Sequence, residues 1–377
     1  MAKINYRLGE LFCGPGGIAL GAINAKARFN GSFCTISHAW ATDYDADTCE
    51  TYRKNISPEN SDTVICHDIR TLDYETLAAI SEIDGLAFGF PCNDFSMVGE
   101  QKGIHGNFGP LYSFGVKALN MFRPKWFFAE NVGGLRNAND GKAFDIILNS
   151  FRDSGYKLVP HLYKFEKYGV PQARHRIIII GIRDDIPQTF RVPSPEPYAS
   201  INVLSRNAIE NPPISAKAPN HEFTRQSQTV VERLKHIKPG ENAFNAELPD
   251  HLKLNVKGAK ISQIYKRLDP YKPSYTVTGS GGGGTHVYHW AENRALTNRE
   301  RARLQTFPDS FVFCGSKESV RKQIGMAVPP RGGEVVFNAL LASLSGIEYP
   351  FISPNIVAVE SLFEQTHYVV NEKNGAY

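Results

Sequence analysis

The stretch RLGELFCGPGG, residues 7–17, decides the fold, because a short apolar run there ends in a cluster of glycines. From Ile18 to Ile23 the apolar residues recur at roughly helical spacing. This order predicts a strand, a glycine turn and a helix, with the turn at the carboxyl end of the strand.

Further apolar runs predict the rest of the sheet. They lie at residues 85–90, 126–129 and 177–182, and the last contains four consecutive isoleucines. Segments of helical length at 112–121 and 142–154 separate these runs. Continuous β-branched and aromatic runs are typical of strands that are buried on both faces. We therefore expect an α/β fold with a parallel sheet and crossover helices.

Length and composition exclude several classes of protein. The chain has 377 residues, of which 42% are hydrophobic and 21% charged, as in globular proteins and unlike disordered or fibrous ones. This length predicts two domains, or one large domain with an insertion. No apolar run approaches the roughly 20 residues of a membrane-spanning helix, and residues 1–11 do not resemble a signal peptide. The six cysteines form no Cys-x-x-Cys pair, so we expect a reducing cytoplasm and neither a zinc knuckle nor a disulfide framework.

The basic surplus is confined to one segment of the chain. The net charge is +4, and residues 183–295 hold 15 basic and 11 acidic side chains, whereas the remainder is balanced. The same segment contains 11 of the 23 prolines. This composition fits a separate module that faces an anionic partner, and it fits a long solvated insertion equally well.

Glycines and acids follow the first strands, beyond whose carboxyl ends an open parallel sheet binds its ligands. Glycines let the backbone approach a ligand closely, although they are also typical of a tight connection. Asp43 is suited to bind the two hydroxyls of a ribose, and Tyr44 could cover the face of an adenine. Asp68 falls where the edge of the adenine would lie. Each acid also fits a helix N-cap or a surface turn. Three acids in order along successive strands, Asp43, Asp45 and Asp68, favour a cofactor that contains adenosine.

Later strand ends carry residues suited to catalysis. Cys92 follows a proline and precedes a glycine-rich loop, which suits a nucleophile, whereas free cysteines are usually small buried hydrophobes. Glu130 ends an apolar strand, where desolvation would raise its pKa and suit it to proton donation; capping of the next helix is the alternative. Arg174 and Arg176 alternate along an extended segment and suit a base carbonyl, a phosphate, a carboxylate or acids of the sheet. We expect no metal site.

Taken in order, these motifs resemble those of the DNA cytosine-5 methyltransferases of bacterial restriction–modification systems. Similarity extends over the chain except for about 185–260, and six motifs in one order make coincidence implausible. The matching segments are 12–17, 91–92, 130–132, 172–176, 299–309 and 323–329.

The resemblance implies a Rossmann-like, mostly parallel sheet of the class I methyltransferases. It implies methyl transfer from S-adenosylmethionine to carbon 5 of a flipped-out cytosine in a short, specific sequence of duplex DNA. The Cys92 thiolate would add to carbon 6, because a thiolate is both a nucleophile and a competent leaving group. Glu130 would stabilise charge at N3 of the base, Arg176 would meet its O2, and Arg174 would orient the site.

The resemblance also assigns binding residues. Contacts with the cofactor are expected at Phe12, Gly14, Gly16, Gly17, Asp43, Tyr44, Asp68, Ile69, Pro91, Leu111 and Ala327. Contacts with DNA are expected at Ser96, Lys102, Arg267, Thr278, Gly279 and Gly281. The glycines would allow a loop to enter the major groove, and a flexible surface loop is the alternative.

The implied organisation has three parts. A catalytic and S-adenosylmethionine-binding domain occupies residues 1–185, a target-recognition domain with its hinge 186–315, and a returning helix within 316–377 completes the first domain. The expected partner is double-stranded DNA. We expect a cytoplasmic, nucleoid-associated monomer without a membrane partner; any cognate restriction endonuclease would form no stable complex with it.

Three residues depart from the family pattern: Glu10 replaces Asp, Asn93 replaces Gln, and Met326 replaces Asn. We expect Met326 to alter the kinetics modestly without abolishing activity. Methylation of RNA is a rival function, disfavoured by Ser96 and by the long insertion. A silent DNA-binding homologue has no use for the thiol, and an NAD-dependent oxidoreductase would need a dinucleotide fingerprint that this chain lacks.

Overall fold

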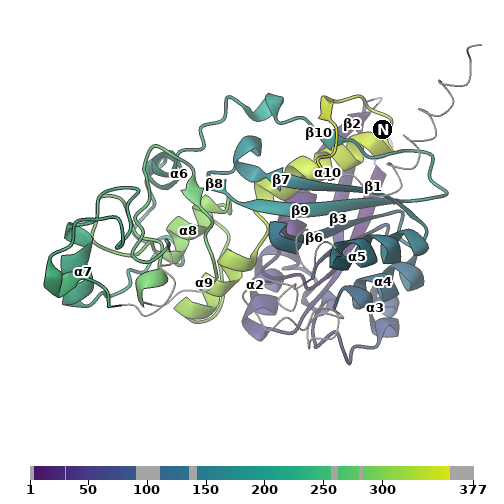
Figure 1. The fold of residues 1–377 in the computed structure, drawn as a ribbon. Coiled ribbons are helices and arrows are strands. Elements are labelled where there is room, and N and C mark those ends of the chain that lie inside the picture. The colour runs from purple at the N-terminus through teal and green to yellow at the C-terminus, as the bar shows by residue number, and fades with distance from the viewer. Residues whose placement is uncertain are drawn as a thin grey trace, which may run out of the picture.

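The main sheet of the computed structural model has eight strands (Figure 1). The structure describes residues 4–29, 31–90, 111–135, 142–255, 262–279 and 283–356. In spatial order the strands are β2 (Lys26–Phe29), β3 (Ser32–Asp43), β1 (Ile4–Leu11), β5 (Gly85–Gly89), β6 (Trp126–Val132), β9 (His175–Arg183) and β7 (Tyr156–Lys164), with β4 (Val64–Cys66) beside β3.

The sheet is mostly parallel, as predicted, but one edge is reversed. Strands β4, β3, β1, β5 and β6 run parallel, whereas β9 is antiparallel to both β6 and β7. Only residues 165–174 connect β7 to β9, and a parallel crossover needs a dozen or more residues. The isoleucine strand therefore returns antiparallel, which the parallel expectation missed. Strand β2 is also antiparallel to β3.

Helices cover both faces of this sheet. Helices α1 (Gly17–Asn24) and α10 (Pro330–Leu344) pack on one face, and α3 (Tyr74–Ile80), α4 (Leu111–Phe122) and α5 (Lys142–Asp153) pack on the other. Side chains alternate between the faces along each strand. In β6, Trp126 and Phe128 join the core under α10, whereas Phe127 and Ala129 join the core under α5. The predicted doubly covered α/β sheet and helices α4 and α5 are confirmed.

The described residues between 205 and 327 form a second packed region, on the left in Figure 1, with apolar clusters of its own. It contains little regular structure. Its elements include α6 (Ser205–Glu210), α7 (Gln228–Lys235), β11 (Ser274–Tyr275), α8 (Asn298–Leu304) and α9 (Lys317–Met326). A small sheet ties it to the first region, because β11 pairs with β8 (Gln172–Ala173), whereas β10 (Val192–Pro193) pairs with β12 (Phe351–Ile352) beside α10.

The chain returns to the main sheet through two helices and not one. The sequence predicts a single helix from Gln323 to about Gly346, but α9 ends at Met326 and α10 begins at Pro330. Consecutive prolines at 329 and 330 explain the break, because proline lacks an N–H and disfavours helical backbone in the residue before it. Among the described residues, no helix combines the length and apolarity that crossing a membrane requires.

Candidate active site

The glycine turn after β1 is built on unusual backbone angles. Phe12, Gly14 and Gly16 have φ values of 53°, 55° and 95°, and Gly16 caps the start of α1. A Cβ on Gly17 would lie 2.3 Å from the carbonyl oxygen of Val328, so no side chain fits between α1 and the segment after α9. The turn is therefore tight, and the backbone of Val328, distant in the sequence, packs against the start of the following helix.

Asp43, at the end of β3, lies beside this turn. Its carboxylate accepts hydrogen bonds from the backbone N–H of Gly14 at 3.0 Å and from that of Asp45 at 3.1 Å. Burial nevertheless raises the pKa of Asp43, because desolvation outweighs these bonds. Asp45 is the N-cap of α2 (Ala46–Ile56) and accepts from the N–H of Thr48 at 3.0 Å, so one acid of this segment has the capping role.

A pocket of about 780 Å³, counting its opening to solvent, lies between the turn, Asp43 and α9. Lys322 is a lining residue that the sequence analysis missed. Its Nζ lies 3.7 Å from Asp45 Oδ2 and 5.7 Å from the centre of the Tyr44 ring. The lining residues are Phe12, Cys13, Gly14, Pro15, Gly17, Ile18, Asp43, Tyr44, Asp45, Thr48, Gly89, Glu130, Lys322, Gln323, Met326, Ala327 and Val328.

The pocket unites several of the predicted cofactor residues and leaves others aside. Phe12, Gly14, Gly17, Asp43, Tyr44 and Ala327 line it, and Gly16 shapes the turn behind it. Asp68 forms an ion pair with Arg70 at 2.5 Å and is not among the residues that line this pocket. Ile69 and Leu111 are buried in the core and do not line this pocket. Pro91 lies outside the described residues.

Glu130 reaches one end of the pocket from β6. Its Oε1 lies 2.8 Å from the Nε of Arg176 on the neighbouring strand β9, and both side chains are almost buried. Burial raises the pKa of Glu130, while Arg176 and Arg174 act in the opposite direction. A raised pKa is the one expected for a glutamate at the end of an apolar strand, and the pairing with Arg176 gives the carboxyl a fixed orientation.

Asn131 joins Glu130 to the end of β5. Its Nδ2 donates to the carbonyl of Phe90 at 3.0 Å, and its Oδ1 accepts from the N–H of Val132 at 2.8 Å. A Cβ on Gly89 would lie 3.2 Å from Glu130 Oε2. The end of β5 and Phe90 therefore lie beside Glu130 and Asn131. Cys92 follows Phe90 by two residues in the sequence. Cys92, Asn93, Ser96 and Lys102 themselves lie outside the described residues.

Arg174 is not among the residues that line the pocket. It is buried, and its two Nη atoms donate to the carbonyls of Val277 at 3.2 Å and Gly325 at 2.9 Å. Of the two arginines that the sequence places on one side of the strand, only Arg176 contacts Glu130 directly. Arg174 instead connects β8 and β9 to the segment around Val277 and to the end of α9.

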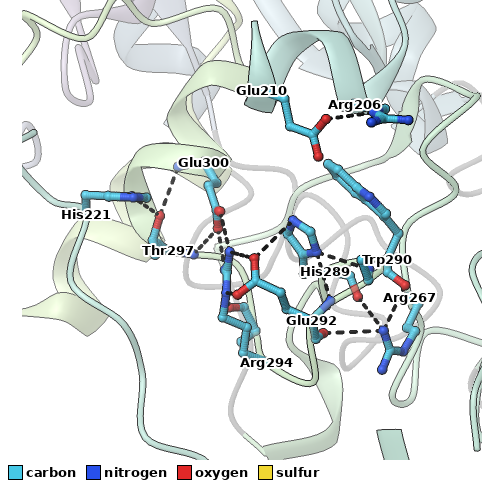
Figure 2. Close-up of polar contacts among 12 residues, drawn as sticks. Arg206, Glu210, His221, Arg267, His289, Trp290, Glu292, Arg294, Thr297 and Glu300 are labelled. Carbon is cyan, nitrogen blue, oxygen red and sulfur yellow. Dashed lines mark hydrogen bonds and ion pairs between the residues drawn. The ribbon is translucent and has the colours of Figure 1, made fainter. Parts of the chain in front are cut away.

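Arg267 is buried inside the second region, where Figure 2 shows its guanidinium among backbone groups. It donates to the carbonyls of Leu234, His289, Trp290 and Glu292 at 2.8–3.3 Å and to the side chain of Asn293. The prediction that Arg267 contacts DNA is therefore corrected, because these carbonyls already hold its guanidinium. Of the other predicted DNA contacts, Thr278 is exposed, and Gly279 lies against α9. Gly281 lies outside the described residues.

Residues 6–342 match the family of C-5 cytosine-specific DNA methylases. The chain belongs to this family. The methylase is 55% identical to the Type II methyltransferase M.BbvI of Brevibacillus brevis, over 97% of this chain and 100% of that protein. It is 40% identical to the Type II methyltransferase M.NgoFVII of Neisseria gonorrhoeae, over 86% and 83%. The family resemblance drawn from the motifs is confirmed, and the protein is a DNA (cytosine-5-)-methyltransferase.

Solved structures show that the fold of the methylase is shared. A prophage protein from E. coli described as a DNA modification methyltransferase has a TM-score of 0.69 at 22% identity, covering 90% of this chain and 99% of that one. Dnmt2 from S. pombe has a TM-score of 0.57 at 18% identity, covering 89% and 98%. At these identities the similarity concerns the fold alone.

Proposed function

We propose that this methylase takes the methyl group from S-adenosylmethionine and transfers it to a cytosine that has been flipped out of duplex DNA. The observation that carries the proposal is the juxtaposition of the pocket beside the glycine turn and Asp43 with the Glu130–Arg176 pair, at the strand end that leads to Cys92. The family accounts for methylation of carbon 5 of cytosine in DNA. The donor, the flipped base and the covalent step are our inference.

The pocket has groups that fit S-adenosylmethionine. The Asp43 carboxylate, fixed by two backbone N–H groups, would accept from the ribose hydroxyls, and the exposed Tyr44 would cover the adenine. The amino terminus of α1 at the glycine turn would bind the carboxylate of the methionine part of S-adenosylmethionine. When bound, the cofactor supplies an electrophilic methyl group. Phe12, Gly14, Gly17 and Ala327 would enclose it, with Pro91 at the same edge.

The reacting base would be held by Glu130 and Arg176. Carbon 5 of cytosine is a poor nucleophile, so the Cys92 thiolate first adds to carbon 6 and places electron density on carbon 5. Glu130, whose pKa burial raises, would hold a proton at N3 as negative charge builds in the ring. Arg176 would donate to O2 of the base. After methyl transfer, loss of the carbon-5 proton and elimination of the thiolate release the product.

The second region would recognise the DNA. Extruding a base costs about a few kcal/mol, which contacts with the duplex must offset. Thr278, Gly279 and Gly281 would face the major groove, and Ser96 and Lys102 would contact phosphates near the flipped base. In this proposal residues 186–315 are the recognition domain and hinge, and residues 1–185 and 316–377 form the catalytic domain. We propose a monomer that acts on chromosomal DNA in the cytoplasm and forms no stable complex with a restriction endonuclease.

Transfer of a radioactive methyl group tests this function. Incubation with methyl-tritiated S-adenosylmethionine and duplex DNA should place the label in 5-methylcytosine, and Cys92→Ala should abolish it. Cys314→Ala is a matched control, because Cys314 is a free, half-buried thiol that does not line the pocket, and this variant should label DNA normally. Normal labelling by Cys92→Ala would refute the role of the thiol, and label in RNA alone would refute the substrate.

A further inference from the structure

The end of helix α9 forms one wall of the pocket and is fixed by side chains from other segments of the chain. Helix α9 ends at Met326, so its last carbonyls have no partner within the helix. The Nε2 of Gln305 donates to the carbonyl of Ile324 at 2.7 Å and to that of Ala327 at 3.3 Å. Gly325, between them, accepts from Arg174. Side chains distant in sequence therefore fix the backbone that carries Met326 and Ala327 into the pocket.

Gln172 extends this network to the segment that faces DNA in our proposal. Its Nε2 donates to the Oε1 of Gln305 at 3.0 Å and to the carbonyl of Leu304 at 3.1 Å, and its Oε1 accepts from the N–H of Val277 at 2.9 Å. Arg174 donates to the carbonyl of the same valine. Both backbone polar groups of Val277, one residue before Thr278, are thus bound by this network.

The two held segments also touch each other directly. A Cβ on Gly325 would lie 1.9 Å from the backbone nitrogen of Gly279, so the end of α9 and the segment around Val277 meet backbone to backbone. Gln172 and Gln305 are completely buried. A buried amide that loses its partner costs about 1–3 kcal/mol, so a shift of either segment alone is penalised.

We propose that Gln172 and Gln305 are positioning residues that couple occupancy of the cofactor pocket to the placement of the DNA-facing segment 276–279. A ligand that orders Met326 and Ala327 orders the carbonyls that Gln305 binds, and Gln172 passes this constraint to Val277. Binding of DNA to segment 276–279 acts in reverse, because coupling between two sites is reciprocal. This inference rests on the proposed cofactor and DNA sites, and it adds the path that links them.

A thermodynamic cycle tests the coupling. The Kd of S-adenosylhomocysteine is measured with and without a duplex carrying the site that methylome sequencing of an expressing host identifies. We expect the duplex to tighten binding by about 5-fold to 100-fold in the wild type. In Gln305→Leu and Gln172→Leu the tightening of S-adenosylhomocysteine binding by the duplex should fall below about 2-fold. The Kd measured without DNA should change by a smaller factor than the Kd measured with DNA. The double variant should lose no more than either single one, because the two amides act as a pair.

Asn220→Gly is the control for a general loss of stability. The Asn220 side chain forms hydrogen bonds with both backbone groups of Phe313 and with Arg299 in the second region, outside the Gln172–Gln305 network. The backbone of Asn220 has a φ of 62°, which glycine accepts. This variant should keep the wild-type coupling. If Gln305→Leu does not fold, Gln305→Asn, which keeps an amide one methylene shorter, replaces it.

Three results would overturn the inference: wild-type coupling in folded Gln305 and Gln172 variants, equal loss in Asn220→Gly, or no coupling in an active wild type. Failure of the proposed function is distinguishable from these, because the wild type would then transfer no methyl group to DNA.

Discussion

Glu10 is completely buried beneath the glycine turn, where the Tyr52 hydroxyl donates to its Oε2 at 3.1 Å. Burial raises the pKa of Glu10 well above its usual value, and the charge of Asp43 adds to this, whereas the bond from Tyr52 opposes it. The folded protein therefore holds this proton more tightly than the unfolded chain does. The free energy of unfolding should fall as pH rises above about 4.3, by up to about 1.4 kcal/mol per pH unit.

Glu10→Gln should remove this decline, because an amide carries no titrating proton and can still accept from Tyr52. Urea unfolding of both proteins at pH 5, 6, 7 and 8 measures it, and the variant should gain on the wild type as pH rises. Parallel stability curves would show that Glu10 is not held protonated.

Glu130→Gln should lower kcat by about 10²-fold to 10⁴-fold, the usual contribution of a proton donor, without altering the fold. Glu166→Gln is the matched control, since Glu166 also forms a hydrogen bond with a residue of β9, through Oε1 at 2.9 Å from His175 Nε2, but does not line the pocket. Single-turnover methylation assays compare the two variants. Equal rates for Glu130→Gln and the control would remove Glu130 from the mechanism.

Sequence alone could identify these reactive residues but not their neighbours. The motif around Arg174 predicts an arginine at the site, yet its partners Val277 and Gly325 lie more than 100 residues away. Arg267 has the chemistry of a phosphate contact, and only folding shows that four carbonyls surround it. Residue type limits what a side chain can bind, and the fold decides what it meets.

At the scale of elements, α8 depends on one buried carboxylate. Glu300 accepts from the backbone N–H of Thr297 at 2.7 Å and from both Nη atoms of Arg294 at 2.8 Å (Figure 2). Thr297 completes a capping box by accepting from the N–H of Glu300. Glu300→Ala should therefore cost about 1–3 kcal/mol, because the N–H of Thr297 loses its acceptor and Arg294 keeps only Glu292 of its two carboxylate partners.

Glu210→Ala is the control for this prediction, because the nearby Glu210–Arg206 pair is exposed and such pairs contribute little. Urea midpoints of the two variants give the comparison. A loss for Glu300→Ala as small as that for Glu210→Ala would contradict the role given to the carboxylate.

Elements differ in how far sequence could predict them. The Thr-x-x-Glu spacing of the capping box and the apolar strands are local signals, so the strand and helix positions near the site follow from them. The direction of β9 is not local. It depends on the ten-residue connection from β7 and on pairing with β6, which precedes β9 in the sequence with α5 and β7 between them.

For the whole molecule, the basic surplus of residues 183–295 predicts binding that is strongly dependent on salt. If at least four phosphates are neutralised, the affinity for duplex DNA should fall by about 100-fold between 50 and 200 mM salt, through release of counterions. Fluorescence anisotropy over this range measures the slope. A flat dependence would contradict the assignment of this region to DNA.

The most direct measurement for the account is covalent capture on a duplex that carries 5-fluorocytosine at the methylated position. Elimination of the thiolate needs a hydrogen at carbon 5, so fluorine there should halt the reaction after methyl transfer. We predict a one-to-one adduct that survives denaturation, with the added mass on the peptide containing Cys92, and none with Cys92→Ala. An active wild-type protein that forms no adduct, or an adduct on another residue, would contradict the central claim.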